Sequence, residues 1–489
     1  MRPPTIKKKQ KAARVILSAR LNSHVELDVR ADGTIAATIH GNAISLGKLS
    51  ASAAKRAQDL KSGLSLDSFA ADGLDIGVEI ERLVRRLAMH GLLEFPLGRS
   101  RDDDEVVIEP QIPHYWPRMP QLDNADMLAL SRFAYMRRRG NDMILESPLA
   151  GALFRICDPK KIAGALALLS TPQPMKQLRQ QDDFPGHELL ALLLDCRIVF
   201  KIDSARGDGL RTGEGDDNLV LWDFHDLLFH ARSTLGRHAN PVGGLCPYAG
   251  LIAPLPAVRP AWAGRKIELG NISPAGSDEI SAVTKVLRDR HSTRIFDDQR
   301  PITLPELARV LENVARIRAR WESTLDFGDG GPVVSFASRP YPSCGASYPL
   351  ELYLAVNKCD GLASGFYHYD ADIHALVPID ARKEELEAHV AGAALAMGSH
   401  ASPQILITIA ARFGRVSWKY SSIAYALILK DVGVLMQTLY VVLTDLGLGG
   451  CAIGTADISL FANMTGLEVH VEGPVGQFAL GRGLPQAGD

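Results

Sequence analysis

The sequence predicts an α+β protein in which two small winged-helix-like modules precede a larger C-terminal α+β domain. Three observations indicate this class: a strand, turn and helix plan that occurs twice in the first two hundred residues, a charged, proline-rich segment between the copies, and a change to buried strands and a long apolar helix after residue 216. The expected division is a basic disordered tail at residues 1–20, modules at 21–100 and 121–205, and a third domain at 216–489.

The first module begins with an alternation typical of a half-buried strand. Apolar and polar residues alternate over residues 25–29, Ala31-Asp32-Gly33 supplies a turn, and residues 34–39 form the returning strand. Helices are expected over residues 49–60 and around Ile80, Leu83, Val84 and Leu87, which share one face. Gly91 is the expected stop of the second helix.

The second module is expected to repeat this plan. Residues 143–145 and 198–200 are predicted strands, residues 161–169 are helix-like, and residues 189–194 are apolar. Between the modules, residues 99–120 combine Asp102-Asp103-Asp104-Glu105 with four prolines, which predicts a linker or an extended crossover. Two interpretations of the modules stay open: packing domains, or a clamp for a peptide or protein partner.

The C-terminal domain contains the longest apolar segments of the chain. Helices are predicted over residues 222–232, 279–290 and 421–446, and buried strands over 350–356 and 405–410. Residues 432–443 are the best candidate for a membrane span, but they are too short and contain Gln437 and Thr438. No membrane segment is therefore expected.

Composition excludes several classes of function. The 54 Lys+Arg and 56 Asp+Glu leave a formal net charge of -2, which argues against nucleic acid or an anionic membrane as the main partner. The 6 cysteines are scattered without a C-x-x-C pair, which fits neither a zinc site nor a dense disulfide framework. We expect a cytoplasmic protein without a metal site.

The first candidate functional segment of the C-terminal domain is rich in cationic residues. Residues 288–294 read Arg-Asp-Arg-His-Ser-Thr-Arg, and guanidinium groups with a hydroxyl between them suit a phosphate. Taken alone, such a cluster is more often surface charge at a helix end.

Two further segments are rich in small residues. Residues 339–349 read Arg-Pro-Tyr-Pro-Ser-Cys-Gly-Ala-Ser-Tyr-Pro before a strand, and small residues there allow a flat ligand to approach the backbone. Residues 446–454 read Leu-Gly-Leu-Gly-Gly-Cys-Ala-Ile-Gly. A dinucleotide-binding turn would open a helix after a strand, whereas these glycines follow a helix, so a Rossmann site is not expected.

Together these motifs resemble the nitroreductase-like flavoproteins, and among them the SagB-type dehydrogenases, the azoline or thiazole/oxazole-forming oxidases. The resemblance covers residue 216 to the end. It rests on R-H-S-x-R (290–294), R-P-Y-P-S-x-G-A leading into L-E-L-Y, K-D-V-G-V-L-x-Q-x-L-Y (430–440), L-G-L-G-G-C-A-I-G and the closing Gly481-Arg482.

The resemblance implies a homodimer with FMN at the subunit interface. It assigns Arg290, His291, Ser292 and Arg294 to the phosphate of FMN, with Arg482 helping. It places Pro342, Ser343, Cys344 and Gly345 along the flavin, where they could arrive from the partner subunit. It also places the turn formed by Gly449, Gly450 and Cys451 close to the isoalloxazine ring.

Lys419 and Tyr420 are the expected catalytic residues, because the family carries a Lys-Tyr pair before the long helix. Oxidation of an azoline to an azole removes two electrons and two protons, so one ring carbon loses a proton and its neighbour delivers a hydride. A lysine in a desolvated or cationic site can be the general base, and the tyrosine can orient the ring or relay the proton.

The implied function is FMN-dependent oxidation of thiazoline or oxazoline rings in a ribosomally synthesised peptide, with dioxygen as the final acceptor. The implied partners are the azoline-containing precursor peptide and a cyclodehydratase. Two alternatives stay open: a general NAD(P)H-dependent nitro or quinone reductase, and a non-catalytic scaffold of a peptide-modifying complex.

Overall fold

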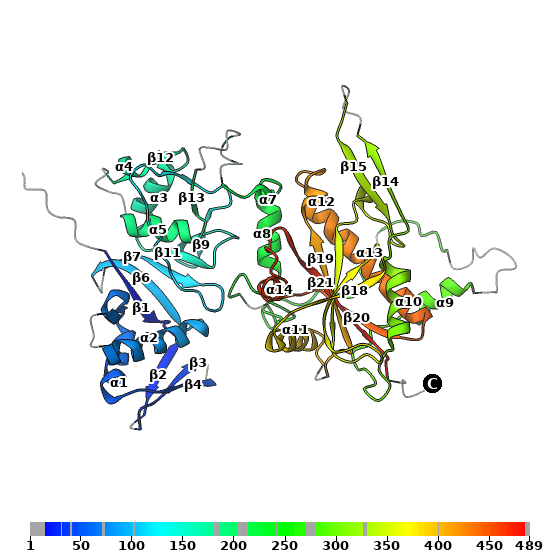
Figure 1. Cartoon of the computed structure of the whole chain (residues 1–489), viewed down its shortest axis with the longest axis horizontal. Helices are drawn as coiled ribbons and strands as arrows, with labels where there is room; N and C mark the ends of the chain where they lie inside the picture. The colour runs from blue at the N-terminus through cyan, green and yellow to red at the C-terminus, as the bar shows by residue number, and fades with distance from the viewer. Residues whose placement is uncertain are drawn as a thin grey trace, which may run out of the picture. The chain divides into compact units, whose positions relative to one another are not determined.

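The computed structural model divides the chain into two compact units. Unit 1 contains residues 1–232 and 236–240, and unit 2 contains residues 233–235 and 241–489 (Figure 1). The structure describes residues 15–30, 32–39, 42–70, 74–100, 103–179, 186–202, 209, 211, 214–240, 242–259, 261, 263–269, 280–325, 330–399 and 401–484.

A seven-stranded antiparallel sheet forms the centre of unit 1. Its order is β5 (Leu64–Ser65), β1 (Ile16–Leu21), β6 (Leu93–Ser100), β7 (Asp103–Pro110), β11 (Ala152–Ile156), β10 (Asp142–Glu146) and β9 (Tyr135–Arg139). Two small sheets accompany it: β2 (Val25–Val29), β3 (Thr34–Ile39) and β4 (Asn42–Lys48), and β12 (Gln173–Pro174), β8 (Met127–Leu130) and β13 (Val199–Lys201).

The linker expected at residues 99–120 is wrong over its first half. Residues 103–110 form β7, which lies between β6 and β11 and therefore joins the two expected modules in one sheet. Its acidic start is held by an ion pair, since Arg20 reaches Asp104 at 2.8 Å. Its apolar end is fully buried, with Val107 and Ile108 inaccessible. Strand pairing and burial outweigh the local charge here.

The described helices of unit 1 are α1 (Ala51–Ala57), α2 (Leu74–Met89), α3 (Pro159–Leu168), α4 (Met175–Leu178), α5 (His187–Asp195), α7 (Asp217–Val220) and most of α8 (Phe224–Ser233). Four of them, namely α1, α2, α3 and α8, lie close to where helices are predicted, whereas no helix is predicted at α4 or α7. Short 3-10 turns lie at Gln58–Lys61 and Leu66–Ala70. Two expected boundaries differ: β1 begins at Ile16, inside the expected tail, and unit 1 extends to Arg232, beyond residue 216. Residues 1–14 of the tail lie outside the described residues.

Unit 2 is built on a six-stranded antiparallel sheet. Its order is β18 (Ala375–Ile379), β17 (Gly365–Asp370), β16 (Leu350–Val356), β19 (Ile405–Arg412), β21 (Glu472–Gly481) and β20 (Gly449–Ile453). The predicted strands at 350–356 and 405–410 are confirmed. A separate hairpin, β14 (Ala319–Thr324) and β15 (Val333–Ser338), precedes the sheet in the sequence.

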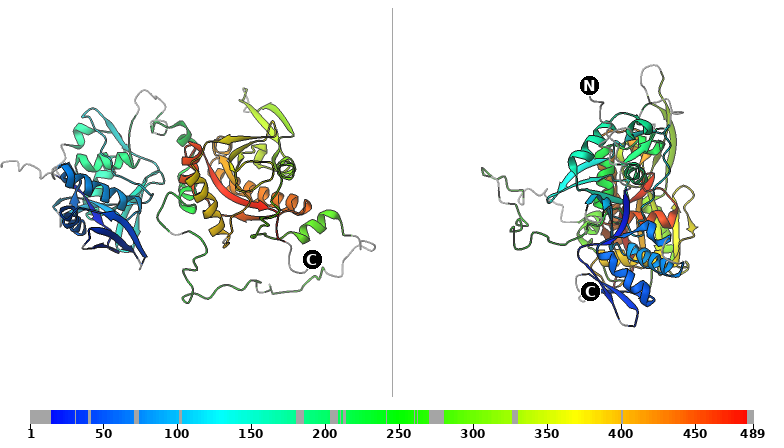
Figure 2. Two further views of the ribbon diagram at one scale, coloured as in Figure 1. Left: turned by 60° about the horizontal axis from the view of Figure 1, so that its bottom comes forward. Right: turned by 90° about the vertical axis from the view of Figure 1, so that its left-hand side faces the viewer.

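Helices cover both faces of this sheet (Figures 1 and 2). On one face, α11 (Lys383–Ala396) and α14 (Ile458–Thr465) pack on Tyr353, Leu406 and Cys451. The long α13 (Ala424–Asp445) packs against β16, β20 and β21, and α10 (Leu304–Ala315) packs on α13. The remaining described helices are α9 (Ala282–Asp289) and α12 (Gly414–Ser417), with a 3-10 turn at Cys344–Ala346.

The long helix is also the one described helix whose length and composition would allow it to cross a membrane. The sequence predicts a candidate of residues 432–443 that is too short to span a membrane, whereas α13 has 22 residues. Its apolar residues include Leu435 and Leu439, which are fully buried within unit 2, and its Asp431 accepts hydrogen bonds there. These residues fix one side of α13 in unit 2, and 33% of its most apolar window is buried there.

Candidate functional site

The cation-rich segment follows α9 and lies against α13. The hydroxyls of Ser292 and Tyr440 are hydrogen-bonded at 2.8 Å, and the Arg290 guanidinium stacks 5.1 Å from the centre of the Tyr440 ring. The backbone N–H of Ala452 donates to the same Tyr440 hydroxyl at 2.9 Å. Tyr440 thus connects the segment at 290–294 to strand β20.

The glycines after α13 let this segment lie directly on the sheet. The N–H of Thr293 donates to the carbonyl of Gly450 at 2.8 Å. A Cβ atom at Gly449 would lie 2.6 Å from the Thr293 side chain, and one at Gly450 would lie 2.4 Å from Phe478. Both distances are too short for a side chain, so these positions require glycine. The expected turn at Gly449, Gly450 and Cys451 is wrong: these residues begin β20, which pairs with β21.

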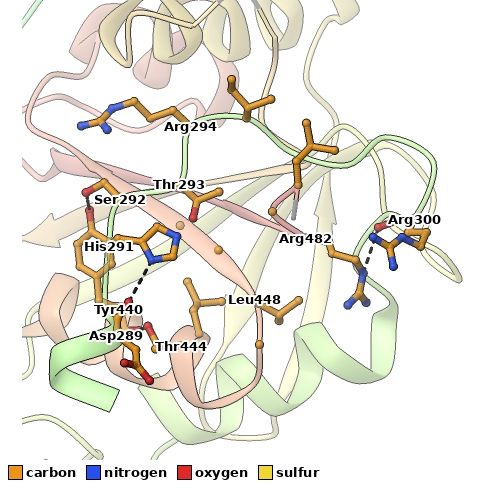
Figure 3. Close-up of a pocket in the computed structure, with 17 residues that line it drawn as sticks. Asp289, His291, Ser292, Thr293, Arg294, Arg300, Tyr440, Thr444, Leu448 and Arg482 are labelled. Carbon is orange, nitrogen blue, oxygen red and sulfur yellow. Dashed lines mark hydrogen bonds between the residues drawn. The ribbon is translucent and has the colours of Figure 1, made fainter. Parts of the chain in front are cut away.

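A cavity of about 1120 Å³ opens between these elements. Six of the expected cofactor residues line it: His291, Ser292, Arg294, Gly449, Gly450 and Arg482. Figure 3 shows Ser292 and Tyr440 together on one side and Arg482 beside Arg300 on another. Neither Arg290 nor Cys451 lines the cavity. The Cys451 side chain packs in the core under α11 and α14, and burial raises the pKa of its thiol.

The arginines that line the cavity differ in whether a carboxylate pairs with their guanidinium group. Arg482 donates two hydrogen bonds to Glu306, at 2.6 and 2.8 Å, and Arg300 donates to Asp297 at 2.9 Å. Burial alone would raise the pKa of Glu306, but the bonds from Arg482 and Thr303 lower it below its ordinary value. No carboxylate among the described residues pairs with Arg294, which is therefore the cation most available to an anion.

The expected flavin loop at 342–345 is held from α13 by Asp431. This carboxylate is only 5% exposed and accepts from the Ser343 hydroxyl at 2.5 Å and from the Cys344 N–H at 3.2 Å. The Ser343 hydroxyl in turn accepts from the Tyr348 N–H at 2.9 Å. Burial raises the pKa of the Cys344 thiol to about 11, and the Asp431 charge adds to this rise, so the thiol is protonated at neutral pH.

Lys419 and Tyr420 lie against the same loop. The Lys419 amine donates to the Gly345 carbonyl at 3.5 Å and is exposed. Gly345 has a φ of 51°, and a Cβ atom there would lie 2.4 Å from the Tyr420 hydroxyl and 2.6 Å from the Lys419 amine. The positive φ favours glycine at this contact, and a larger residue would displace the ends of the Lys419 and Tyr420 side chains. The two expected catalytic residues come after α12 and precede α13.

The structure thus gathers the expected site residues into two clusters within unit 2. The first contains the segment at 290–294, β20 and Arg482, and the second contains the loop at 342–345 with Lys419 and Tyr420. Both contact α13, the first through Tyr440 and the second through Asp431. These residues are nine positions apart, which is about 14 Å along a helix axis.

Comparison with known proteins assigns the C-terminal half of the chain to a family. The model of the nitroreductase family matches residues 287–482, and that of cyanobactin oxidase ThcOx matches residues 128–239. A putative nitroreductase of Methanocaldococcus jannaschii is 31% identical over 169 residues, which is 76% of that protein and 35% of this chain. This chain belongs to the nitroreductase family. The resemblance expected from its motifs is confirmed, as is the α+β nitroreductase-like fold of its C-terminal half.

Two solved structures similar to this nitroreductase family member contain a bound peptide or cofactor. One is the E. coli microcin synthetase McbBCD complex with truncated pro-MccB17 bound, with a TM-score of 0.39 and 19% identity, covering 57% of this chain and 100% of that one. The other is a putative nitroreductase of Desulfovibrio desulfuricans in complex with FMN, with a TM-score of 0.27 and 15% identity, covering 42% of this chain and 88% of that one.

Sequence reasoning missed two residues that connect the parts of the candidate site. Tyr440 connects the first cluster, and Asp431 fixes the loop of the second. Both belong to the motif at 430–440, so the signal was present in the sequence. The motif at 430–440 identifies Asp431 and Tyr440 as residues of interest, but only the fold shows which segment each of them contacts.

Proposed function

We propose that this protein is an FMN-dependent dehydrogenase that oxidises thiazoline or oxazoline rings to thiazoles or oxazoles in a ribosomally synthesised peptide. The observation that carries the proposal is the match of residues 128–239 to the cyanobactin oxidase model in a chain whose C-terminal half is a nitroreductase. A reductase of small molecules has no need of that segment. The Lys419–Tyr420 pair beside the Gly345 loop supplies the residues for ring chemistry.

The donors of the cavity fit the phosphate of FMN. The Ser292 hydroxyl and the Arg294 guanidinium line one cavity with His291 and Arg482. A guanidinium without a carboxylate partner gains most from a charge-assisted bond to phosphate. When bound, FMN supplies a two-electron acceptor that takes up a hydride. The relative from Desulfovibrio desulfuricans, solved with FMN, agrees with this choice of cofactor.

The chain's own residues then provide proton transfer and orientation. Conversion of an azoline to an azole releases one hydride and one proton from adjacent ring atoms. The Lys419 amine takes the proton, and the Tyr420 hydroxyl beside it orients the ring. The hydride electrons leave the protein to dioxygen, which becomes hydrogen peroxide. General-base catalysis of this kind contributes about 10²- to 10⁴-fold in rate.

The proposal includes the assembly in which the enzyme works. We propose a homodimer in which the loop at 342–345 of one subunit reaches the cofactor of the other. A cyclodehydratase is the expected partner, because cysteine or serine must be cyclised to an azoline before the oxidation. We place the enzyme in the cytoplasm, in keeping with six cysteines that are all unpaired.

Mass spectrometry of an azoline-containing peptide tests the function. The flavin-loaded protein should remove about two mass units per ring, the two hydrogens of the azoline. Lys419→Ala should remain folded and yellow but lose at least about 100-fold in rate, since it lacks the general base. Lys383→Ala is the matched control, because this lysine lies on α11 and contacts Glu387. A wild-type protein that takes up no FMN would contradict the proposal.

A second candidate is a general NAD(P)H-dependent nitro or quinone reductase. It is favoured by the 31% identity to a putative nitroreductase. NAD(P)H should then bleach the bound flavin rapidly, and azoline peptides should be unchanged in mass. A scaffold without catalysis would instead give no turnover with either substrate, and Lys419→Ala would leave its complex with the partner unaffected.

A further inference from the structure

The hairpin β14–β15 carries an aromatic pair outside the core. Trp321 and Phe336 are cross-strand partners, with ring centres 5.7 Å apart and planes inclined by 16°. Every residue of β14 is exposed, and Trp321 itself is 45% exposed. We call these two rings the aromatic wall. Phe336 is partly buried and Trp321 is nearly half exposed, so the pair presents apolar surface on the hairpin that a ligand could cover.

The hairpin is fastened to the second cluster of the site. The Arg415 guanidinium donates to the Ser335 carbonyl of β15 at 3.1 Å and to the Ser347 carbonyl of the flavin loop at 3.1 Å. The Lys419 amine lies 5.8 Å from the centre of the Phe336 ring. Arg415 thus joins the hairpin to the loop, while Phe336 places the wall beside the proposed general base.

We infer that the aromatic wall is the subsite that binds the peptide substrate, stacking on its heterocycle so that the ring lies beside the Lys419 amine. The inference rests on the proposed function and names residues that select its substrate. Flat rings stack with centres about 4.5–7 Å apart, and the Lys419 amine lies 5.8 Å from the centre of the Phe336 ring. A ring that stacks against Phe336 on the side where this amine lies is therefore next to the base.

The hairpin also offers a place for the peptide on either side of the ring. In the described part of the chain, β14 pairs with β15 alone, so its outer edge keeps free backbone N–H and carbonyl groups. An extended peptide can bind such an edge by main-chain hydrogen bonds. A small nitroaromatic compound would use the rings but not the edge. The combination therefore favours a peptide that carries the heterocycle.

Variants of Trp321 test this subsite. Trp321→Leu keeps an apolar side chain but loses the flat face, and it should raise the KM for an azoline peptide about 3- to 10-fold while kcat stays within about twofold. Trp321→Phe should restore most of the affinity. Tyr248→Leu, which alters an exposed aromatic residue outside the hairpin, is the matched control and should change neither value. Flavin absorbance should be the same in all variants.

A binding measurement separates this inference from the proposed function. The anisotropy of a dye-labelled azole peptide, titrated with flavin-loaded protein, should give a Kd raised by a similar factor in Trp321→Leu and in Phe336→Leu. Unchanged Kd and KM in both variants would overturn the inference while leaving the oxidation intact. A wild-type protein that binds the labelled azole peptide at the wall but never lowers the mass of the matching azoline peptide would sink the proposed function alone. A wild-type protein that binds no peptide would overturn the inference as well.

Discussion

At the scale of single residues, Asp431 holds a strained loop in the shape the site needs. Three residues at the end of the loop at 342–345 and just after it have positive φ, at 51° for Gly345, 53° for Ala346 and 43° for Tyr348. Each such residue other than glycine costs on the order of 1–3 kcal/mol. The Asp431 carboxylate offsets this cost through its bonds to the Ser343 hydroxyl and the Cys344 N–H, which are charge-assisted.

Replacing this carboxylate should loosen the loop. Asp431→Asn keeps the size of the side chain but removes the charge and one acceptor, so we expect the free energy of unfolding to fall by about 1.5–3 kcal/mol. Ser343→Ala should remove part of the same interaction. In a double-mutant cycle followed by chemical denaturation, the two losses should therefore not add. Losses that simply add would contradict the role of Asp431.

The Cys344 thiol gives a second readout of the same change. Burial and the Asp431 charge together raise its pKa to about 11, so Asp431→Asn should lower the pKa and speed alkylation of this thiol at pH 8. Cys344→Ala identifies the signal among the six cysteines. If Asp431 did not act on the Cys344 thiol, Asp431→Asn would leave the rate of Cys344 alkylation unchanged.

At the scale of secondary-structure elements, a buried polar group connects α11 to the central strands. The ring of His389 on α11 is hydrogen-bonded to the Thr408 hydroxyl of β19 at 2.7 Å and lies 3.2 Å from the Gln477 amide of β21. The side chain of His389 is 3% exposed, and burial lowers its pKa to about 4. These strands form the middle of the sheet that carries the site.

This histidine should make the stability of unit 2 depend on pH. Above about pH 6.5, the ring is neutral in both the folded and the unfolded chain, and the full stability is present. As the pH falls from about 6.5 toward 4, only the unfolded chain takes up the proton, so stability declines by up to about 1.4 kcal/mol per pH unit. Thermal unfolding of wild type and His389→Gln at pH 7.5 and 5.0 measures this, and the variant should lose less on acidification. An equal loss in both proteins would rule out His389 as the cause.

At the scale of the whole molecule, the candidate site and the segment matched by the cyanobactin oxidase model lie mostly in different units. The expected flavin and catalytic residues all lie in unit 2, whereas most of the segment matched by the cyanobactin oxidase model lies in unit 1. A ligand stabilises only the folded unit that binds it. FMN at 100 times its Kd should add about 2.7 kcal/mol to the stability of unit 2.

Differential scanning calorimetry with and without FMN tests this division. We expect the transition of unit 2 to move to higher temperature while the transition of unit 1 stays in place. Thr303→Ala, which removes the capping box at the start of α10, identifies the transition of unit 2, because it should lower that transition alone. A shift of the unit 1 transition upon addition of FMN would contradict the assignment of the cofactor to unit 2.

Much of the fold could be predicted because periodicity reports burial along one element. Residues 421–446 were predicted as a long helix and form α13 at Ala424–Asp445, and the predicted strand at 350–356 is confirmed as β16. Residues 103–110 were missed, because acidic residues and flanking prolines disguise a strand whose stability comes from its neighbours on both sides.

The sequence by itself determined the family and the candidate site residues, because the cation-rich motif, the glycine-rich motif and the Lys419–Tyr420 pair are local patterns. Only the tertiary structure decided their grouping: Ser292 and Gly449 line one cavity, whereas Gly345 lies with Lys419 in a separate cluster. It also decided that β7 joins the two expected modules and that Asp431 holds the loop at 342–345. The physical reason is that these contacts join residues far apart in the chain, and their energies depend on burial and partners that no local pattern contains.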